Sequence, residues 1–396
     1  MTNAKVNPTP WANTGYTNDP NYSDPKSQQW QVSVERQLTH SSLISVAYVG
    51  SKTQRLDYTG KANEPVGPFC ENAAQCATPV TSAQAEETEY LPFSATGWNY
   101  AESTGISNYN ALQAQYHQRF SNGLTALVAY TWSKCLSTSN GWFNAENGEL
   151  GDPIEDYFNP SLAYGICGFD TPQEFNVSGV YHLPFGKGHQ WLTHGPLAWA
   201  LGNWDANFSF LMRSGQAFNP TWGGASGVCS ATVTTNCVPV SIGGLATTSS
   251  DPAGLSVPGS SYTGYSRPSL LSGCNVHGGQ SQTQWYNPGC FVSPASPLVG
   301  PGYGFGNTGV GSLRTQDFNN LDFSLIKNVP IRESKTLQLR FEGFNVFNHM
   351  VWSEPGAGIS PSFSSSTSAV SYGSAGVISG IASTPRELQM AAKFSF

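Results

Sequence analysis

Apolar and polar residues alternate with a period of two along nine segments of the chain. In one of these segments, Trp204, Phe208 and Met212 fall on one parity, while Asp205 and Asn207 fall on the other. Because successive side chains of a β-strand point to opposite faces, this alternation predicts strands with one apolar and one polar face. The nine segments are 29–38, 43–52, 110–120, 124–134, 174–183, 204–213, 319–327, 337–345 and 388–396.

Two classes of all-β protein share this pattern. A soluble β-sandwich buries one face of each strand in a protein core. A transmembrane β-barrel turns that face to lipid and carries aromatic residues where its strands meet the membrane surfaces. Aromatic residues do stand near the ends of the segments, namely Trp30, Phe120, Trp132, Phe175, Trp204, Phe318, Phe347 and Phe396. They favour the barrel, although the alternation itself fits both classes.

The lengths of the connections separate the two classes. Short and long connections follow one another in turn, and the long ones cover about 53–107, 135–172, 214–316 and 349–384. Bacterial outer-membrane barrels have short periplasmic turns and long extracellular loops, whereas a sandwich gives no reason for such an order. We therefore predict an antiparallel transmembrane β-barrel formed by residues 28–396, after a loop-like extracellular start at residues 1–27.

The number of predicted strands is odd. A single-chain bacterial barrel has an even number of strands, and an open edge within lipid leaves backbone groups without partners. We therefore expect these nine strands to be the C-terminal part of a larger barrel.

Composition agrees with a β-protein in a membrane. Charged residues make up 11% of the chain, against about 25% in a soluble protein. The mean hydropathy of −0.28 and the lack of a long apolar run exclude a bundle of transmembrane helices. The net charge of −7 argues against a nucleic-acid partner. The first residues show no signal-peptide pattern.

Eight cysteines lie in or beside the long connections, and no two of them form a CxxC pair. An even number without zinc-ligand spacing favours disulfides formed in an oxidising compartment, although the sequence cannot establish which cysteines pair. We expect sequential bridges that stiffen the loops. The predicted pairs are Cys70–Cys76, Cys135–Cys167, Cys229–Cys237 and Cys274–Cys290.

Several segments resemble strands of the Oar-like TonB-dependent receptors of the bacterial outer membrane. Residues 25–38 (PKSQQWQVSVERQL) and 46–51 (VAYVGS) are similar to a mid-barrel hairpin of that family. Residues 123–134 (GLTALVAYTWSK) resemble a second recurring strand. The family's last three strands are similar to 320–327 (NLDFSLIK), 339–348 (LRFEGFNVFN) and the terminal 393–396 (KFSF). The resemblance extends over 21–396, and its motifs mark strands, not a substrate.

The resemblance implies a barrel of about 22 strands. It further implies a signal peptide, a carboxypeptidase-regulatory-like β-domain and a plug ahead of the barrel, none of which is visible here. Contact with the TonB system would therefore run through a missing plug region. A terminal aromatic such as Phe396 resembles the signal that the barrel-assembly machinery reads.

Few residues suggest reaction chemistry. Residues 304–309 match G-x-G-x-x-G, but we interpret this as coincidence because no helix is predicted after them to hold a pyrophosphate. His182, His189 and His194 lack the spacing of metal ligands and are better explained as lumen or turn residues. No nucleophile stands at an interpretable distance from a base.

Other polar and aromatic groups have alternative explanations. A cluster of carboxylates offers oxygen ligands for Ca²⁺, although the spacing of a calcium loop is missing and a solvated loop explains it better. The aromatic loop residues suit stacking on a sugar or peptide about as well as they suit anchoring in the interface. The carboxylates are Glu146, Glu149, Asp152, Glu155, Asp156 and Asp170, and the aromatic residues are Trp98, Tyr100, Trp142, Phe143, Tyr157 and Phe158.

Arg340 and Glu342 share the polar face of one predicted strand, and Asp322 lies on the neighbouring strand. We interpret the three as charges of a polar lumen, where structural pairing is the simplest role and plug binding the other one.

Together these features predict a segment of a TonB-dependent outer-membrane transporter, in contact with outer-membrane lipid and without catalytic activity or cofactor. The alternatives are an adhesion or surface-display barrel, and a soluble β-sandwich that binds a ligand. The sequence does not identify the substrate.

Overall fold

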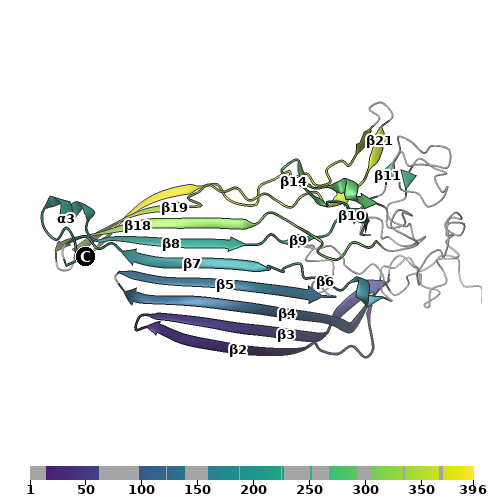
Figure 1. Ribbon diagram of the computed structural model, residues 1–396, viewed down its shortest axis with the longest axis horizontal. Coiled ribbons are helices and arrows are strands. Elements are labelled where there is room, and N and C mark those ends of the chain that lie inside the picture. The colour runs from purple at the N-terminus through teal and green to yellow at the C-terminus, as the bar shows by residue number, and fades with distance from the viewer. Residues whose placement is uncertain are drawn as a thin grey trace, which may run out of the picture.

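The computed structural model describes residues 15–61, 98–121, 123–138, 159–186, 188–223, 225–226, 250–251, 267–292, 306–332, 335–364 and 369–396. Nine long strands form one antiparallel sheet and follow each other in sequence order (Figure 1). Each strand overlaps one of the nine predicted segments. The strands are β2 (Lys26–Thr39), β3 (Ser42–Lys61), β4 (Trp98–Ser121), β5 (Leu124–Ser137), β7 (Gln173–His182), β8 (Trp204–Arg213), β18 (Phe318–Arg332), β19 (Lys335–Phe344) and β23 (Glu387–Ser395).

Cross-strand pairing keeps the alternation in register across the sheet. Directly opposite residues of an antiparallel pair share a face, so each row of partners is uniform in character. One row is apolar: Val34, Val46, Ala114, Tyr130, Phe175 and Met212. The next row is mostly polar: Ser33, Ala47, Gln113, Thr131, Glu174 and Arg213.

The apolar face of the sheet is open to its surroundings. Trp132 is 60% exposed and Phe341 is 39% exposed, although both stand within the apolar rows. Within the part of the chain that the structure describes, no second sheet covers this face. A β-sandwich would bury it, so the sandwich alternative is not the observed architecture.

The two ends of the sheet differ. The short connections and the C-terminus lie at one end, beside the short helix α3 (Pro196–Leu201), and the long connections lie at the other (Figure 1). Among the described residues, β2 and β23 each pair on one side only, so the sheet has two free edges. No described helix is long and apolar enough to cross a membrane.

The connection predicted at 53–107 is shorter than expected, because β3 and β4 continue as a paired hairpin up to Lys61 and Asn99. The register shifts between Gln54 and Leu56 and again before Tyr58, which breaks the period of two that marks a strand in the sequence. The start predicted as a loop at 1–27 also contains strand residues. Within this start, strand β1 (Gly15–Asn18) pairs in parallel with β4, and β2 begins at Lys26.

The described residues of the other three long connections share one small hydrophobic core at the end of the sheet opposite the short connections. We call these described residues the cap. The core contains residues from all three connections, including Ile166, Trp222, Tyr286, Val310 and Ile359. The short elements of the cap are β6 (Gly165–Ile166), β9 (Ala217–Phe218), β10 (Thr221–Trp222), β11 (Ala225–Ser226), β12 (Ser250–Asp251), β13 (Ser269–Leu270), β14 (His277–Ser281), β15 (Gln284–Tyr286), β16 (Phe291–Val292), β17 (Leu313–Arg314), β20 (Gly358–Ile359), β21 (Ser362–Ser364) and β22 (Ala369–Ser371), with 3-10 turns at Pro160–Leu162 and Pro288–Cys290.

Candidate functional site

The polar face of the sheet carries a continuous chain of side-chain hydrogen bonds near the short-turn end. The His182 Nδ1 atom lies 2.5 Å from Asp205 Oδ1 across the β7–β8 pair. Asn328 then donates to Asp205 at 3.0 Å, Gln338 donates to Asn328 at 2.9 Å, and Arg340 Nε donates to Gln338 at 2.8 Å. Four adjacent strands are thus joined by polar side chains. His182 therefore lies on the polar face of the sheet.

The three charges predicted for the lumen share the polar face but do not pair with one another. Asp322 stands opposite Ser209, whereas Arg340 stands opposite Ile326, four residues further along β18. The carboxylate of Asp322 instead accepts from the backbone of Asn345 at 2.9 Å. The expected contact between Asp322 and Arg340 is therefore wrong, because the register separates them.

Glu342 is also satisfied locally. Its Oε2 atom accepts from Gln389 Nε2 at 2.6 Å, across the β19–β23 pair. Glu342 and Arg340 are therefore each bonded to the side-chain amide of a glutamine on this face.

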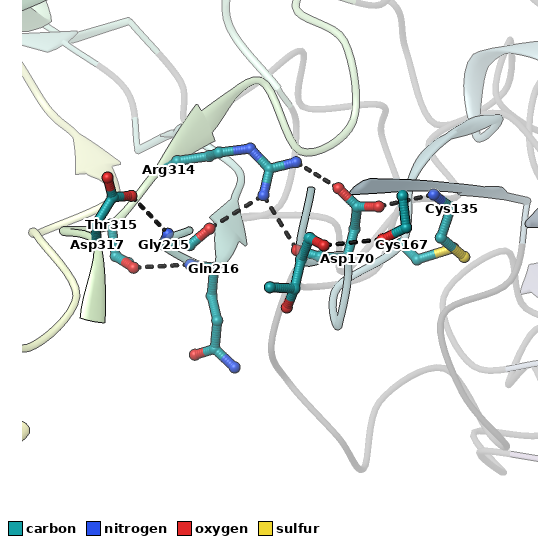
Figure 2. A network of polar contacts seen from close by, with 10 residues as sticks. Cys135, Cys167, Asp170, Gly215, Gln216, Arg314, Thr315 and Asp317 are labelled. Atoms are coloured by element: carbon teal, nitrogen blue, oxygen red, sulfur yellow. Dashed lines mark hydrogen bonds and ion pairs between the residues drawn. A yellow bond between two sulfur atoms is a disulfide. The ribbon is translucent and has the colours of Figure 1, made fainter. Parts of the chain in front are cut away.

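A second network fastens the cap to the sheet (Figure 2). Arg314 Nη2 lies 2.5 Å from Asp170 Oδ2, and Nη1 donates to the carbonyl oxygens of Asp170 and Gly215 at 3.1 and 3.0 Å. The other oxygen of Asp170 accepts from the backbone N–H of Cys135 at 2.7 Å. The Asp170 side chain is 1% exposed, so its charge is compensated inside the protein. These contacts link β5, β17 and the residues after β8.

Two disulfides lie in the cap or at its base. Cys135, on β5, is bonded to Cys167, and Cys274 is bonded to Cys290. These are two of the pairs expected from sequential pairing. The predicted bridges of Cys70 with Cys76 and of Cys229 with Cys237 lie outside the described residues.

A cavity of about 320 Å³ opens on the polar face just below the cap. Its lining includes Tyr109 and Gln113 of β4, Glu174 of β7, and Phe169 from the connection between β5 and β7. Phe169 is 67% exposed, so its ring stands free at the mouth. Aromatic, amide and carboxylate groups therefore meet where the polar face reaches the outer end of the sheet. A second cavity of about 380 Å³ is lined by cap and strand residues, among them Trp285 and Asp317.

The remaining sequence candidates are the other histidines and the G-x-G-x-x-G match. No group of three potential metal ligands occurs among the described residues. His189 and His194 are exposed, and His194 contacts only Thr193, at 2.7 Å, among its described hydrogen bonds. In the part of 304–309 that is described, Asn307 accepts from the backbone of Leu270 at 2.6 Å, and no helix follows.

The acidic cluster is described only at Asp170, which is bound to Arg314. Its other members, Glu146, Glu149, Asp152, Glu155 and Asp156, lie outside the described residues, as do Trp142, Phe143, Tyr157 and Phe158. Trp98 and Tyr100 belong to β4 rather than to a loop. Sequence reasoning missed Arg314, because its partner is 144 residues away and no local pattern joins them.

Comparison with known proteins supplies the family. A family model described as an outer membrane beta barrel domain matches residues 1–389. No curated protein matches the chain. Among solved structures, the chain is similar to the outer membrane transporter YddB from Escherichia coli, at 8% identity over 97% of this chain and 34% of that one, with a TM-score of 0.40. It is similar to the ferric-catecholate import receptor Fiu from E. coli K12, at 10% identity over 95% and 28%, with a TM-score of 0.37. It is also similar to the ferripyoverdine receptor of Pseudomonas aeruginosa, at 8% identity over 94% and 27%, with a TM-score of 0.38.

The chain thus spans about a third or less of the length of these structures. The family match agrees with the antiparallel sheet, its exposed apolar face and its short and long ends. The chain belongs to the outer membrane β-barrel domain family, and its location is the bacterial outer membrane.

Proposed function

We propose that the chain is the C-terminal barrel segment of a TonB-dependent, Oar-like outer-membrane transporter that passes a bulky solute and catalyses no reaction. The observation that carries this proposal is the pair of free edges on β2 and β23, on a sheet whose apolar face is exposed. Each backbone group left unpaired in lipid costs several kcal/mol. Further strands of a longer protein would therefore complete the barrel.

The polar face supports a transport role. The hydrogen-bonded chain from His182 to Arg340 gives a wall that stays hydrated and fixed in shape. The cavity beside Tyr109 and Phe169 gives a place for a solute to rest at the outer mouth of that wall. The sequence motifs that resemble the Oar-like family lie on β2, β3, β5, β18, β19 and β23, which are all strands of this sheet. In this proposal the plug and the TonB contact belong to the rest of the protein, and Phe396 is read by the barrel-assembly machinery.

The cap supports a second candidate, an adhesion or surface-display barrel. Its hydrophobic core and two disulfides make the outer connections a folded body. Such a body suits contact with a macromolecule.

The completeness of the barrel is tested by refolding the chain alone in detergent and measuring conductance in planar bilayers. We expect no regular single-channel steps. Regular steps from heat-modifiable monomers would overturn the proposal that further strands are required.

Transport is tested in cells by deleting the whole protein and, separately, by removing TonB. Loss of uptake of the same solute in both strains supports a transporter. Unchanged uptake of all solutes tested, together with loss of attachment to surfaces, would favour the adhesion barrel instead.

A further inference from the structure

The connection between β7 and β8 exposes large apolar side chains at the short-turn end of the sheet. Trp191 and Leu192 precede helix α3, and Leu197, Trp199 and Leu201 lie on it. Leu197 is 61% exposed and Trp199 is 69% exposed, while Ala198 is buried against the protein. Five large apolar side chains within residues 191–202 are therefore exposed. We call these residues the anchor segment.

The anchor segment is held to the sheet at its C-terminal end. Lys327 Nζ donates to the carbonyl oxygens of Trp199 and Gly202 at 2.8 and 2.7 Å, and Trp204 Nε1 donates to the carbonyl oxygen of Ala200 at 3.0 Å. A positive group at a helix C-terminus satisfies carbonyls that have no partner within the helix. The helix is therefore fixed to the sheet by β8 and β18.

Close packing fixes the start of the connection as well. A Cβ atom added at Gly202 would lie 2.7 Å from the Cα of Gly186, and Gly186 has a φ of +106°. The ring of Trp191 packs 5.8 Å from that of Phe185. The backbone therefore folds back on itself at two glycines.

The sheet contacts place the anchor segment on the apolar face. Lys327 pairs with Trp204 on one side and with Leu339 on the other, within an apolar row. The ring of Trp204 also lies 6.1 Å from that of Phe341. The exposed side chains of the anchor segment thus continue the lipid-facing surface beyond the end of the strands.

We propose that the anchor segment inserts into the periplasmic leaflet of the outer membrane and fixes the depth of the barrel there. Tryptophan is enriched at membrane interfaces, because its ring is apolar and its N–H stays near water. A segment with one apolar face binds in the plane of the interface, about 5–10 Å deep. Lipid is the occupant because this surface is continuous with the lipid-facing rows and because residues 191–202 contain no Asp, Glu, Lys or Arg.

The test places a nitroxide on Leu197→Cys and, separately, on Leu201→Cys in the intact protein in isolated outer membranes. The native cysteines are expected to remain in disulfides, so the introduced thiol takes the label. Val128→Cys, in an apolar row of β5, gives the lipid reference, and Thr283→Cys, exposed in the cap, gives the water reference. We expect both anchor positions to be severalfold more accessible to oxygen than to a nickel chelate, as at residue 128.

Two outcomes would overturn the proposal. Accessibility to the nickel chelate equal to that at residue 283 would place the anchor segment in the periplasm. An immobilised label shielded from both reagents would show that another protein surface covers it. Because labelling reports position and not transport, either result leaves the proposed function standing.

Discussion

Removing the guanidinium of Arg314 should loosen the cap without unfolding the sheet. In Arg314→Met, Asp170 loses its counter-charge and keeps, among the hydrogen bonds described above, the one from the Cys135 backbone. Breaking a buried ion pair by removing one partner costs about 3–5 kcal/mol. Since about 1.4 kcal/mol is a factor of ten, local opening of the cap should become roughly a hundred- to a few thousand-fold more frequent.

Hydrogen exchange measured by mass spectrometry on the membrane-embedded protein detects this opening. Peptides that contain Gly215 and Thr315, whose backbone groups are bonded beside Arg314, should lose protection, while those of β7 should not. The matched control is Arg213→Met, because Arg213 is exposed and its guanidinium lies over the ring of Phe318 at 5.1 Å. That contact contributes about 0.5–1 kcal/mol, so protection should change less than tenfold. Equal loss of protection in both variants, or none in Arg314→Met, would refute the reasoning.

Three further predictions concern the cap and the anchor segment. Replacing Cys135 and Cys167 with Ala should lower the unfolding free energy of the cap by about 3–4 kcal/mol, so that the cap becomes sensitive to protease at a lower urea concentration. An unchanged urea midpoint would contradict the proposed role of this disulfide in stiffening the loops. Burial raises the pKa of Tyr286 above its ordinary value of 10.0, because the buried phenol resists ionisation. The contribution of the neutral Tyr286 to the stability of the cap is therefore complete below pH 10 and is lost as the pH rises further. Phenolate absorbance and hydrogen exchange of the cap should rise together with pH, and Tyr286→Phe should remove this pH-dependent loss of stability. A cap equally stable well above pH 10 would argue against this prediction. Lys327→Met removes two hydrogen bonds to helix α3 and should give a more mobile nitroxide at residue 197, whereas an unchanged spectrum would show that packing alone holds the helix.

The long strands could be predicted because their signal is local and repeats. Each strand of the sheet has one apolar face and one polar face, so each segment carries the same period of two. The signal fails in β3 beyond Gln54, where register shifts place consecutive residues out of phase. The hairpin continues there through backbone pairing, which leaves no mark in the side-chain pattern.

The cap and the polar networks could not be predicted, because their partners are far apart in sequence. Trp222, Tyr286 and Ile359 meet in one core although their sequence neighbours are mostly Gly, Pro, Ser, Thr and Asn, as in an ordinary loop. Asp170 and Arg314 are separated by 144 residues. The disulfide between Cys274 and Cys290 could be predicted, since its cysteines are 16 residues apart within one connection.

The length of β4 has a consequence for how the cell surface meets this protein. The strand has 24 residues, which at about 3.4 Å each gives roughly 80 Å. Even at a tilt of about 45° it rises roughly 55 Å, whereas the apolar band of such barrels is about 25 Å tall. In the proposed orientation, the end of the hairpin and the cap at the same end of the sheet (Figure 1) therefore stand well clear of the lipid headgroups. A phage, an antibody or a protease arriving from outside would contact this projecting end of the sheet before it reached the membrane.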